Sequence, residues 1–305
     1  MRVMSVEQRQ TRPVVGVLWM LVTGLLFVGV TALVKYLGPG IPAPEAAFLR
    51  YAIGLVFLIP LIRPILATRL TRRQWGLFTA RGLAHSMGVA LWFYAMARIP
   101  IADVTAMNYL APIYVTIGAA LFLGEKLAAR RVVAVVVALI GALIILRPGF
   151  REIGPGHLAM LAAAVVFGAS YLLAKLLTDE TNAAIVVGML SIWVTIGLAP
   201  MAIAVWVPPS PHALLVLTLV ALLATAGHYT MTLAFAVAPV TVTQPVSFLQ
   251  LVWAVALGAL FFDEGVDIWV IVGGGVILGS VTFITWREAM LKRRLVTPPA
   301  PATKV

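Results

Sequence analysis

The 305-residue chain contains no cysteine, and only 11% of its residues are charged, against about a quarter in a soluble globular protein. The missing cysteines exclude disulfides, thiolate metal sites and cysteine nucleophiles. The scarcity of charge is matched by an excess of apolar side chains, since 62% of the residues are hydrophobic and the mean hydropathy is +1.05. So few polar side chains cannot cover a soluble globule, and lipid must be the solvent of most of the chain.

Carboxylates are missing from the middle of the apolar runs, because every Asp and Glu lies near the end of a run or in a loop. Ionisable groups inside a membrane are costly and mark functional sites. A carboxylate site that couples transport to protons or sodium is therefore not supported. His85 and His228 are the buried candidates for a proton relay, and the alternative for each is a neutral histidine hydrogen-bonded between helices. Glu125 and Glu264 are expected to cap helices or pair in loops.

The runs themselves recur along the whole chain, with only short polar breaks between them. A bilayer core requires about 20 apolar residues per helix. The sequence therefore predicts an all-α membrane protein with ten transmembrane helices and no separate soluble domain. The expected spans lie near residues 14–36, 46–62, 75–97, 102–123, 132–146, 156–177, 183–207, 213–237, 240–262 and 268–286.

Lys and Arg residues give the chain a formal net charge of +11, and they cluster in loops beside the apolar runs. They form no basic stripe with interleaved aromatics, so nucleic acid is not an expected partner, whereas membrane lipid is. The bias of these residues to one set of loops predicts a multi-pass protein of a bacterial-type inner membrane with both termini in the cytoplasm. This evidence comes mainly from the first half, because no Lys or Arg lies between Lys175 and Arg287.

Internal repetition divides the chain into two halves. A shift of about 140 residues aligns Lys35 with Lys175, and a shift of about 139 aligns Pro100 with Pro239. Five spans per half is an odd number, so the second half must enter the membrane from the opposite face, as in many secondary transporters. The predicted organisation is a cytoplasmic tail over residues 1–13, a first five-helix repeat over 14–147, a second, inverted repeat over 148–287, and a cytoplasmic tail over 288–305.

Several motifs carry a family resemblance. They are the third span ending Ala95-Met96-Ala97-Arg98-Ile99-Pro100, the mid-span Pro112, the segment Leu123-Gly124-Glu125-Lys126 and the fifth span ending Leu146-Arg147-Pro148. This pattern resembles the ten-helix EamA-type branch of the drug/metabolite transporter superfamily, over nearly the whole chain. Among its members, the chain looks most like bacterial exporters of aromatic and other neutral amino acids. The resemblance implies a transporter that works by alternating access.

Helical spacing predicts the faces that line a substrate cavity. In the third span, Arg81, His85, Gly88 and Trp92 recur at i, i+4, i+7 and i+11. Aromatic rings with sparse polar groups suit amphipathic molecules. Ordinary packing of the rings, and hydroxyls bonded back to their own helix, are the alternative. The residues predicted to line the cavity are Phe27, Thr31, His85, Trp92, Asn108, Tyr109, Ser170, Tyr171, His228, Gln244, Ser247 and Phe248.

Pro112 is predicted to bend the fourth span, and the bend is predicted to serve gating. Gly275 and Gly279 form a small-residue pair for close helix packing; a monomer is expected, and a dimer stays open.

The predicted function is secondary or facilitated export of small amphipathic metabolites, above all neutral and aromatic amino acids. The alternative is another substrate of the same superfamily, such as a drug or a sugar- or nucleotide-like metabolite. A membrane enzyme needs clustered His, Asp, Glu or Cys, and a channel needs a filter or a ring of charges. Neither pattern occurs, so no enzyme activity, catalytic residue, metal site or cofactor is expected, and the expected partner is a small-molecule substrate.

Overall fold

The computed structural model describes residues 12–61, 67–124, 129–178, 180–181, 183–238, 243, 246 and 248–296. All of its regular elements are helical. They are α1 (Pro13–Leu37), the 3-10 helix η1 (Gly38–Gly40), α2 (Ala43–Gly54), the 3-10 helix η2 (Leu55–Leu61), α4 (Arg72–Met96), α5 (Ile101–Asn108), α6 (Ala111–Leu123), α7 (Ala129–Leu146), α8 (Pro155–Thr178), α9 (Ala183–Ala204), α10 (Pro211–Val237), α12 (Phe248–Phe261) and α13 (Ile268–Val296).

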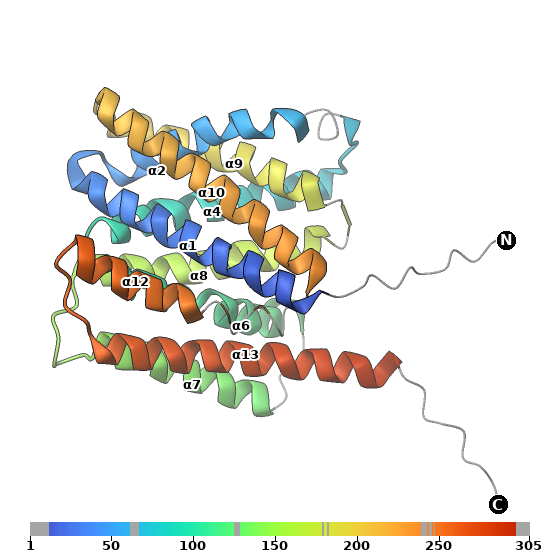
Figure 1. The fold of residues 1–305 in the computed structure, drawn as a ribbon. Helices are drawn as coiled ribbons and strands as arrows, with labels where there is room; N and C mark the ends of the chain where they lie inside the picture. Colours follow the sequence, from blue (N-terminus) through green and yellow to red (C-terminus); the bar gives the residue numbers. More distant parts are fainter. Residues whose placement is uncertain are drawn as a thin grey trace, which may run out of the picture.

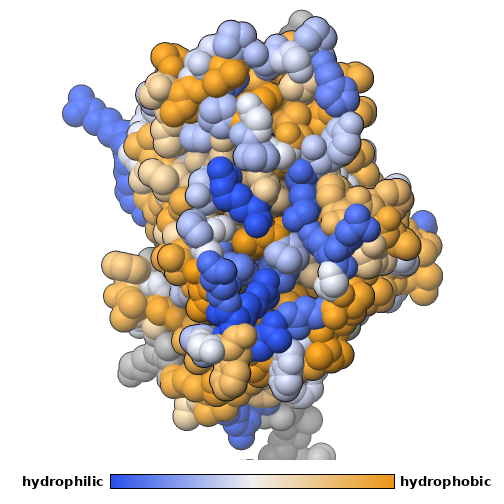
Figure 2. Space-filling model, turned by 90° about the vertical axis from the view of Figure 1, so that its left-hand side faces the viewer, coloured by the Kyte–Doolittle hydropathy of each residue, from blue (hydrophilic) through white to orange (hydrophobic). Residues whose placement is uncertain are grey.

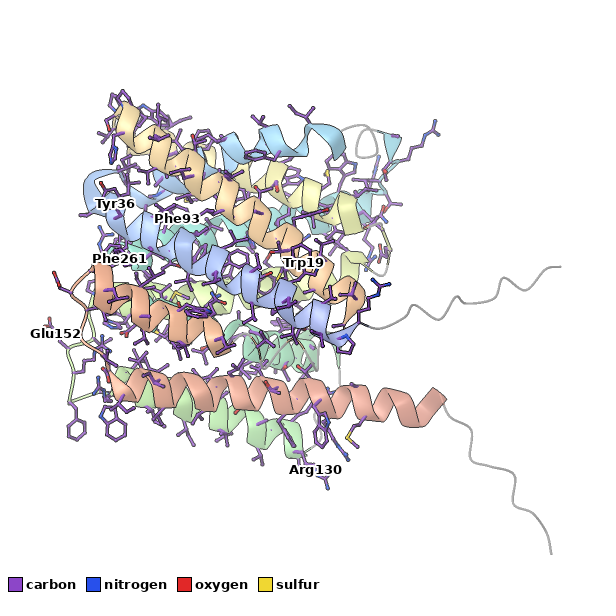
Figure 3. The ribbon with its side chains drawn as sticks, in the orientation of Figure 1. Trp19, Tyr36, Phe93, Arg130, Glu152 and Phe261 are labelled. Atoms are coloured by element: carbon purple, nitrogen blue, oxygen red, sulfur yellow. The ribbon has the colours of Figure 1, made fainter. Side chains whose placement is uncertain are left out.

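The helices run side by side between two ends of a bundle, and α1 begins at the same end where α13 stops (Figure 1). Figure 3 places Tyr36 and Phe261 at one end and Arg130 at the other. We call the first the Lys35 end, after the basic residue in the last turn of α1, and the second the Arg73 end, after the first turn of α4. Many large apolar side chains are exposed along the helices, as expected for a surface that faces lipid.

Seven helical segments among the described residues are long and apolar enough to cross a membrane, against the ten spans that the sequence predicts. The other three predicted spans have identifiable differences. Residues 46–62 form the short α2, which continues as the 3-10 helix η2. The helix α4 has 25 residues but a polar composition, and α12 has 14 residues, with most of residues 239–247 outside the description. Ten spans stay a prediction.

The fourth predicted span is interrupted just before Pro112. Helix α5 ends at Asn108, a turn follows at Tyr109 and Leu110, and α6 starts at Ala111 with Pro112 in its first turn. Proline has no N–H to donate to the carbonyl four residues earlier, and its ring clashes with that carbonyl. The carbonyl in question belongs to Asn108, where α5 stops. The predicted bend is confirmed, and it is a full break between two helices.

Helix packing follows a paired pattern. Helix α1 packs against α10 and α4 against α8, while α1 also contacts α12 and α6 contacts α8. Two further pairs, α2 with α9 and α7 with α13, complete the bundle. Under the predicted equivalence of the halves, the α1–α10 contact is the counterpart of the α4–α8 contact, and α1–α12 is the counterpart of α6–α8. The α2–α9 and α7–α13 contacts each join two equivalent helices.

The α7–α13 contact depends on two glycines. A Cβ atom added at Gly141 would lie 2.8 Å from the carbonyl oxygen of Gly273, and one added at Gly273 would lie 2.6 Å from Cγ1 of Ile145. At Gly279, which the sequence places in a close-packing pair, nothing lies within 4 Å of an added Cβ. The close approach therefore occurs two turns earlier on α13.

We expect Gly273→Leu to lower the stability of the folded protein by about 1 to 3 kcal/mol, because the added side chain forces the two helices apart. Gly279→Leu is the matched control on the same helix and should be nearly neutral. Size-exclusion chromatography of detergent-solubilised protein after heating would measure the stability of both variants. Equal behaviour of the two variants would show that the α7–α13 contact does not limit stability.

Candidate functional site

The polar and aromatic stripe of the third predicted span lies on α4 and faces α8. Glycine at position 88 permits the contact, since an added Cβ would lie 2.8 Å from the ring of Phe167. One turn earlier on α4, Nδ1 of His85 lies 3.1 Å from the hydroxyl of Ser170, a hydrogen bond whose direction depends on the histidine tautomer. Both side chains are buried, and Ser170 is completely so. The two helices are thus joined by a polar contact deep in the bundle.

Aromatic rings surround this contact, and we call His85, Trp92, Phe167 and Tyr171 the ring cluster. The rings of Phe167 and Tyr171 are stacked, with an interplanar angle of 14° and centroids 6.1 Å apart. Trp92 meets Phe167 edge-on at 6.3 Å, and His85 lies 5.0 Å from Phe167. The indole N–H of Trp92 is buried without a hydrogen-bond partner in the described part of the chain. The cluster offers ring surface and an unused donor.

Two buried arginines adjoin the ring cluster. Arg81 precedes His85 by one turn of α4 and donates to the carbonyl of Val186 on α9 at 2.8 Å. Arg50 on α2 holds its guanidinium carbon 4.0 Å from the ring centroid of Tyr51. Both arginines are close enough to interact electrostatically with His85. The sequence analysis placed Arg81 on the cavity stripe of the third span but did not choose it as a cavity residue, and it did not consider Arg50. An arginine inside an apolar run is the signal that would have found both.

Two further predicted cavity residues meet between α1 and α10. The rings of Phe27 and His228 are T-shaped, with centroids 5.1 Å apart. His228 interacts electrostatically with Arg50 and with His85. Helices α1, α2, α4, α8 and α10 therefore contribute side chains to one central region.

The remaining predicted cavity residues make other contacts or lie outside the described residues. Thr31 is buried and donates to the carbonyl of Phe27 on its own helix at 3.1 Å, which is the alternative reading of such hydroxyls. Asn108 ends α5, and Tyr109 in the break pairs with the backbone of Leu251 on α12. Gln244 and Ser247 lie outside the described residues, as does the side chain of Phe248, which starts α12.

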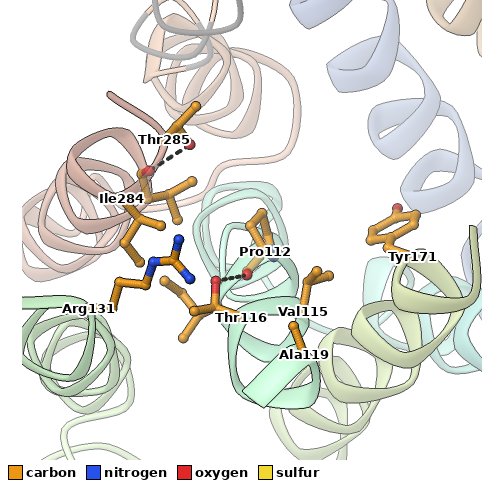
Figure 4. Close-up of a pocket in the computed structure, with 10 residues that line it drawn as sticks. Pro112, Val115, Thr116, Ala119, Arg131, Tyr171, Ile284 and Thr285 are labelled. Atoms are coloured by element: carbon orange, nitrogen blue, oxygen red, sulfur yellow. Dashed lines mark hydrogen bonds between the residues drawn. The ribbon is translucent and has the colours of Figure 1, made fainter. Parts of the chain in front are cut away.

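A pocket of about 300 Å³ has Tyr171 of the ring cluster in its wall, and we call it the Tyr171 pocket. Residues from α6, α7, α8 and α13 line it, and the break at Pro112 forms part of its wall. In Figure 4, Tyr171 lies on one side of α6, while Arg131 and Thr285 lie on the other. Tyr171 is 42% exposed although its neighbour Ser170 is buried. Of the two stacked rings, that of Tyr171 therefore lines this pocket, while Phe167 lies buried behind it.

The Lys35 end carries a network of ion pairs. The carboxylate of Glu264 forms an ion pair with Nζ of Lys35 at 2.6 Å and accepts a hydrogen bond from the backbone N–H of Ile101 at 2.9 Å. The second bond satisfies a free donor at the start of α5. The predicted capping or pairing role of Glu264 is confirmed, while Glu125 lies outside the described residues. A single carboxylate thus ties α1 and α5 to the loop before α13.

The rest of this network centres on Asp103, which is 1% exposed. Its Oδ2 atom forms an ion pair with Arg151 at 2.6 Å and lies 3.0 Å from Nε2 of His157, while Asp267 pairs with Arg147 and Arg151. Of the two histidines predicted to be buried, His85 is confirmed, whereas His228 is exposed; His157, which the sequence analysis did not choose, is 6% exposed and pairs with this carboxylate. Figure 2 looks onto this end, where hydrophilic side chains gather within a hydrophobic surround.

We call these residues the Lys35-end network: Lys35, Asp103, Arg147, Arg151, His157, Glu264 and Asp267. The sequence could not pair them, because the partners are separated by up to 229 residues in the Lys35–Glu264 pair (264 minus 35). Among the described residues, no group of three or more His, Cys, Asp or Glu could hold a metal ion.

Comparisons with known proteins agree with this architecture. One solved crystal structure superposes with a TM-score of 0.56 at 16% identity, covering 93% of this chain and 98% of the other, which shows the fold. The riboflavin transporter of Rhizobium johnstonii is 31% identical over 95% of this chain and 97% of its own length. The S-adenosylmethionine uptake transporter of Rickettsia prowazekii is 25% identical, covering 90% of this chain and 93% of its own.

The pseudopaline exporter CntI of Pseudomonas aeruginosa is 27% identical, covering 86% of this chain and 93% of its own length. The model of the EamA-like transporter family matches residues 14–147 and again residues 154–286, which together make up most of the chain. This confirms the family that the Pro100, Pro112 and Pro148 motifs predict. The protein is a multi-pass membrane protein and belongs to the EamA-like transporter family.

Proposed function

We propose that the protein is a secondary transporter of small amphipathic metabolites that carry an aromatic or heteroaromatic ring. The observation that supports this most is the stacked pair of Phe167 and Tyr171, of which Tyr171 lines the Tyr171 pocket, beside buried polar groups. Planar rings stack on such surfaces, while sparse hydrogen-bonding groups orient the rest of the molecule. Substrate binds at the ring cluster, and the protein acts as a monomer.

Transport proceeds by alternating access between two inverted five-helix halves, residues 14–147 and 148–287. Support comes from the two matches to one family model, at residues 14–147 and 154–286, and from the paired helix contacts. The Lys35-end network adds to this, since Lys35 and Asp103 in the first half pair with Glu264 and Arg151 in the second. These pairs hold the Lys35 end closed while the Tyr171 pocket is open at the other end.

The Arg73 end faces the cytoplasm and both termini lie there, as the arginine bias of the loops indicates. The open pocket then receives substrate from the cytoplasm, which suits export from a bacterial-type inner membrane. Export driven by the substrate gradient needs no coupling carboxylate at the ring cluster. Asp103 and His157 are buried at the Lys35 end, so a pH gradient must be included in any transport assay.

Two substrate classes are favoured by specific observations. Riboflavin is one, because a relative at 31% identity is named for it and a planar ring system suits the stacked pair. Aromatic amino acids are the other, because their rings also stack and their carboxylates suit the nearby arginines. Counterflow in proteoliposomes with labelled riboflavin, tryptophan and alanine, with and without a pH gradient, tests both. The proposal fails if no ring-bearing compound is transported by protein that is folded and inserted.

Trp92→Ala should lower transport of ring-bearing substrates about five- to tenfold while changing that of small ones by less than about twofold, because stacking area is lost. Trp286→Ala is the matched control, since that residue is exposed near the end of the apolar part of α13. Initial rates in proteoliposomes, normalised to folded protein, measure the difference. Equal losses for both kinds of substrate would assign Trp92 to packing alone.

A further inference from the structure

The two arginines beside the ring cluster lie deep within the bundle. Arg81 is nine residues into α4, which places it about 14 Å from the start of that helix at 1.5 Å per residue. Arg50 is seven residues into α2, or about 10 Å from its start at the opposite end. Their exposed fractions are 6% and 8%. Neither can reach a water-facing surface by extending along its own helix, as arginines near span ends do.

Their charges are not neutralised by carboxylates of the described chain. The ion pairs found there involve other cations, and the carboxylates of Glu45, Asp103 and Glu264 bond elsewhere. Nε of Arg81 is buried without a hydrogen-bond partner in the described residues. Arg50 has the ring of Tyr51 as its close contact, at 4.0 Å. Nε of Arg81 is thus a donor that the described residues leave unused, and no ion pair of Arg50 is found among them.

Such an arrangement is unfavourable unless something anionic binds. A guanidinium stays charged in proteins, and burying an unpaired charge costs several kcal/mol. Arg50 and Arg81 also share His85 as an electrostatic neighbour, so two like charges act on one region. Tyr171, which lines the open pocket, interacts electrostatically with Arg81. Arg81 therefore lies near the ring of the cluster that the pocket exposes.

We propose that Arg50 and Arg81 bind an anionic group of the substrate, a carboxylate or a phosphate, while its ring packs on Phe167 and Tyr171. This rests on the proposed function and narrows it to ring-bearing anions and zwitterions. Charge-assisted hydrogen bonds, often bidentate with arginine, supply the affinity. Neutral ring compounds lack the group that compensates the buried charges, so they bind more weakly.

The test uses probe pairs that differ in the anionic group. Riboflavin 5′-phosphate is compared with riboflavin, and tryptophan with tryptophanamide, in binding and counterflow with wild-type protein in proteoliposomes. We expect the anionic member to be favoured at least about tenfold in at least one pair, and which pair responds distinguishes phosphate from carboxylate. Arg81→Gln and Arg50→Gln should each lower kcat/KM for that member about tenfold or more and change its neutral analogue by less than about threefold.

Controls separate recognition from structure. Arg81→Lys keeps the charge and should recover part of the selectivity, although it loses the fork geometry. Arg98→Gln removes an exposed arginine that stacks on Tyr94, away from the cluster, and should leave selectivity unchanged. Equal losses for anionic and neutral probes in Arg81→Gln would mean that its bond to Val186 is structural, and would overturn the inference. A wild type that transports both members equally overturns it while the proposed function stands, and a wild type that transports neither refutes both.

Discussion

Glu264→Ala should reduce transport at least about tenfold, because it removes the carboxylate that ties the two halves together at the Lys35 end. The side chains of Lys35 and Glu264 are 18% and 12% exposed, so their ion pair is largely shielded from water. Breaking a buried pair by removing one partner costs about 3 to 5 kcal/mol, and the partial exposure places this pair at the lower end. A loss of about 3 kcal/mol shifts the ratio of closed to open Lys35 ends by roughly 100-fold.

Cysteine labelling measures that shift directly, because the chain has no native cysteine. A second pocket lies at the Lys35 end, and Glu264 is part of its wall. Ala102→Cys places a thiol in the same wall. A membrane-impermeant maleimide should label it faster in the Glu264→Ala background. The labelling rate in the Glu264→Gln background should lie between those of wild type and Glu264→Ala. The amide oxygen still accepts from the N–H of Ile101, but the charge that pairs with Lys35 is lost. Glu152→Ala, an exposed glutamate at the same end in Figure 3, is the control. Unchanged labelling and transport in folded Glu264→Ala would show that the pair does not hold this end closed.

Helix positions were largely predictable from the sequence, for a physical reason. Hydropathy reports the solvent of a segment, and α1, α7, α8, α10 and α13 are each a single long apolar run, so the predicted spans fall on them. The break at Pro112 was predictable as well, because it follows from the local chemistry of proline. The second and ninth spans were harder to predict. The helices α2 and α12 are short, and the segments that would extend them to full spans are not long regular α-helices in the described residues.

The candidate site was predictable only as faces of helices. Periodicity placed His85 and Trp92 on one stripe of α4, but it could not show that Ser170 and Phe167 on α8 complete the contact. Phe167 was not among the residues predicted to line the cavity. Counting charges in loops finds arginines at span ends, so it does not find Arg50, which lies inside a predicted span. Long-range pairing needs three-dimensional proximity, which a periodic pattern does not contain.

The proposed inverted repeat connects these observations to a mechanism. Exchange of the halves would convert a protein closed at the Lys35 end into one closed at the Arg73 end, because the repeats have opposite orientation. At the Arg73 end, Arg73 on α4 pairs with the exposed Glu180 beyond α8. Exposed pairs contribute little to stability. The imbalance between that pair and the shielded Lys35-end network favours the state that is open at the Arg73 end in the absence of substrate, which is the cytoplasm-open state in the proposed topology.

Asp103→Asn should give the largest loss of stability of any single substitution in this network. Its carboxylate is 2% exposed and is shared by Arg151 and His157, at 2.6 and 3.0 Å. An asparagine of the same shape leaves the partly buried guanidinium with only Asp267, whose oxygen lies 3.8 Å from Nη1. Loss of one partner of a buried pair costs about 3 kcal/mol or more, which lowers the thermal transition by about 10 °C in a protein of this size.

Heating followed by size-exclusion chromatography of detergent-solubilised protein measures the shift, and Asp263→Asn provides the matched control. Asp263 is exposed on the same end of the bundle, and asparagine tolerates its positive φ of 52°. The double variant Asp103→Asn with Arg151→Gln should lose less stability than the sum of the single variants, because the second change removes the stranded charge. Strict additivity, or a shift equal to that of Asp263→Asn, would show that Asp103 and Arg151 are not energetically coupled. In that case the network would close the Lys35 end through Glu264 and Lys35 alone.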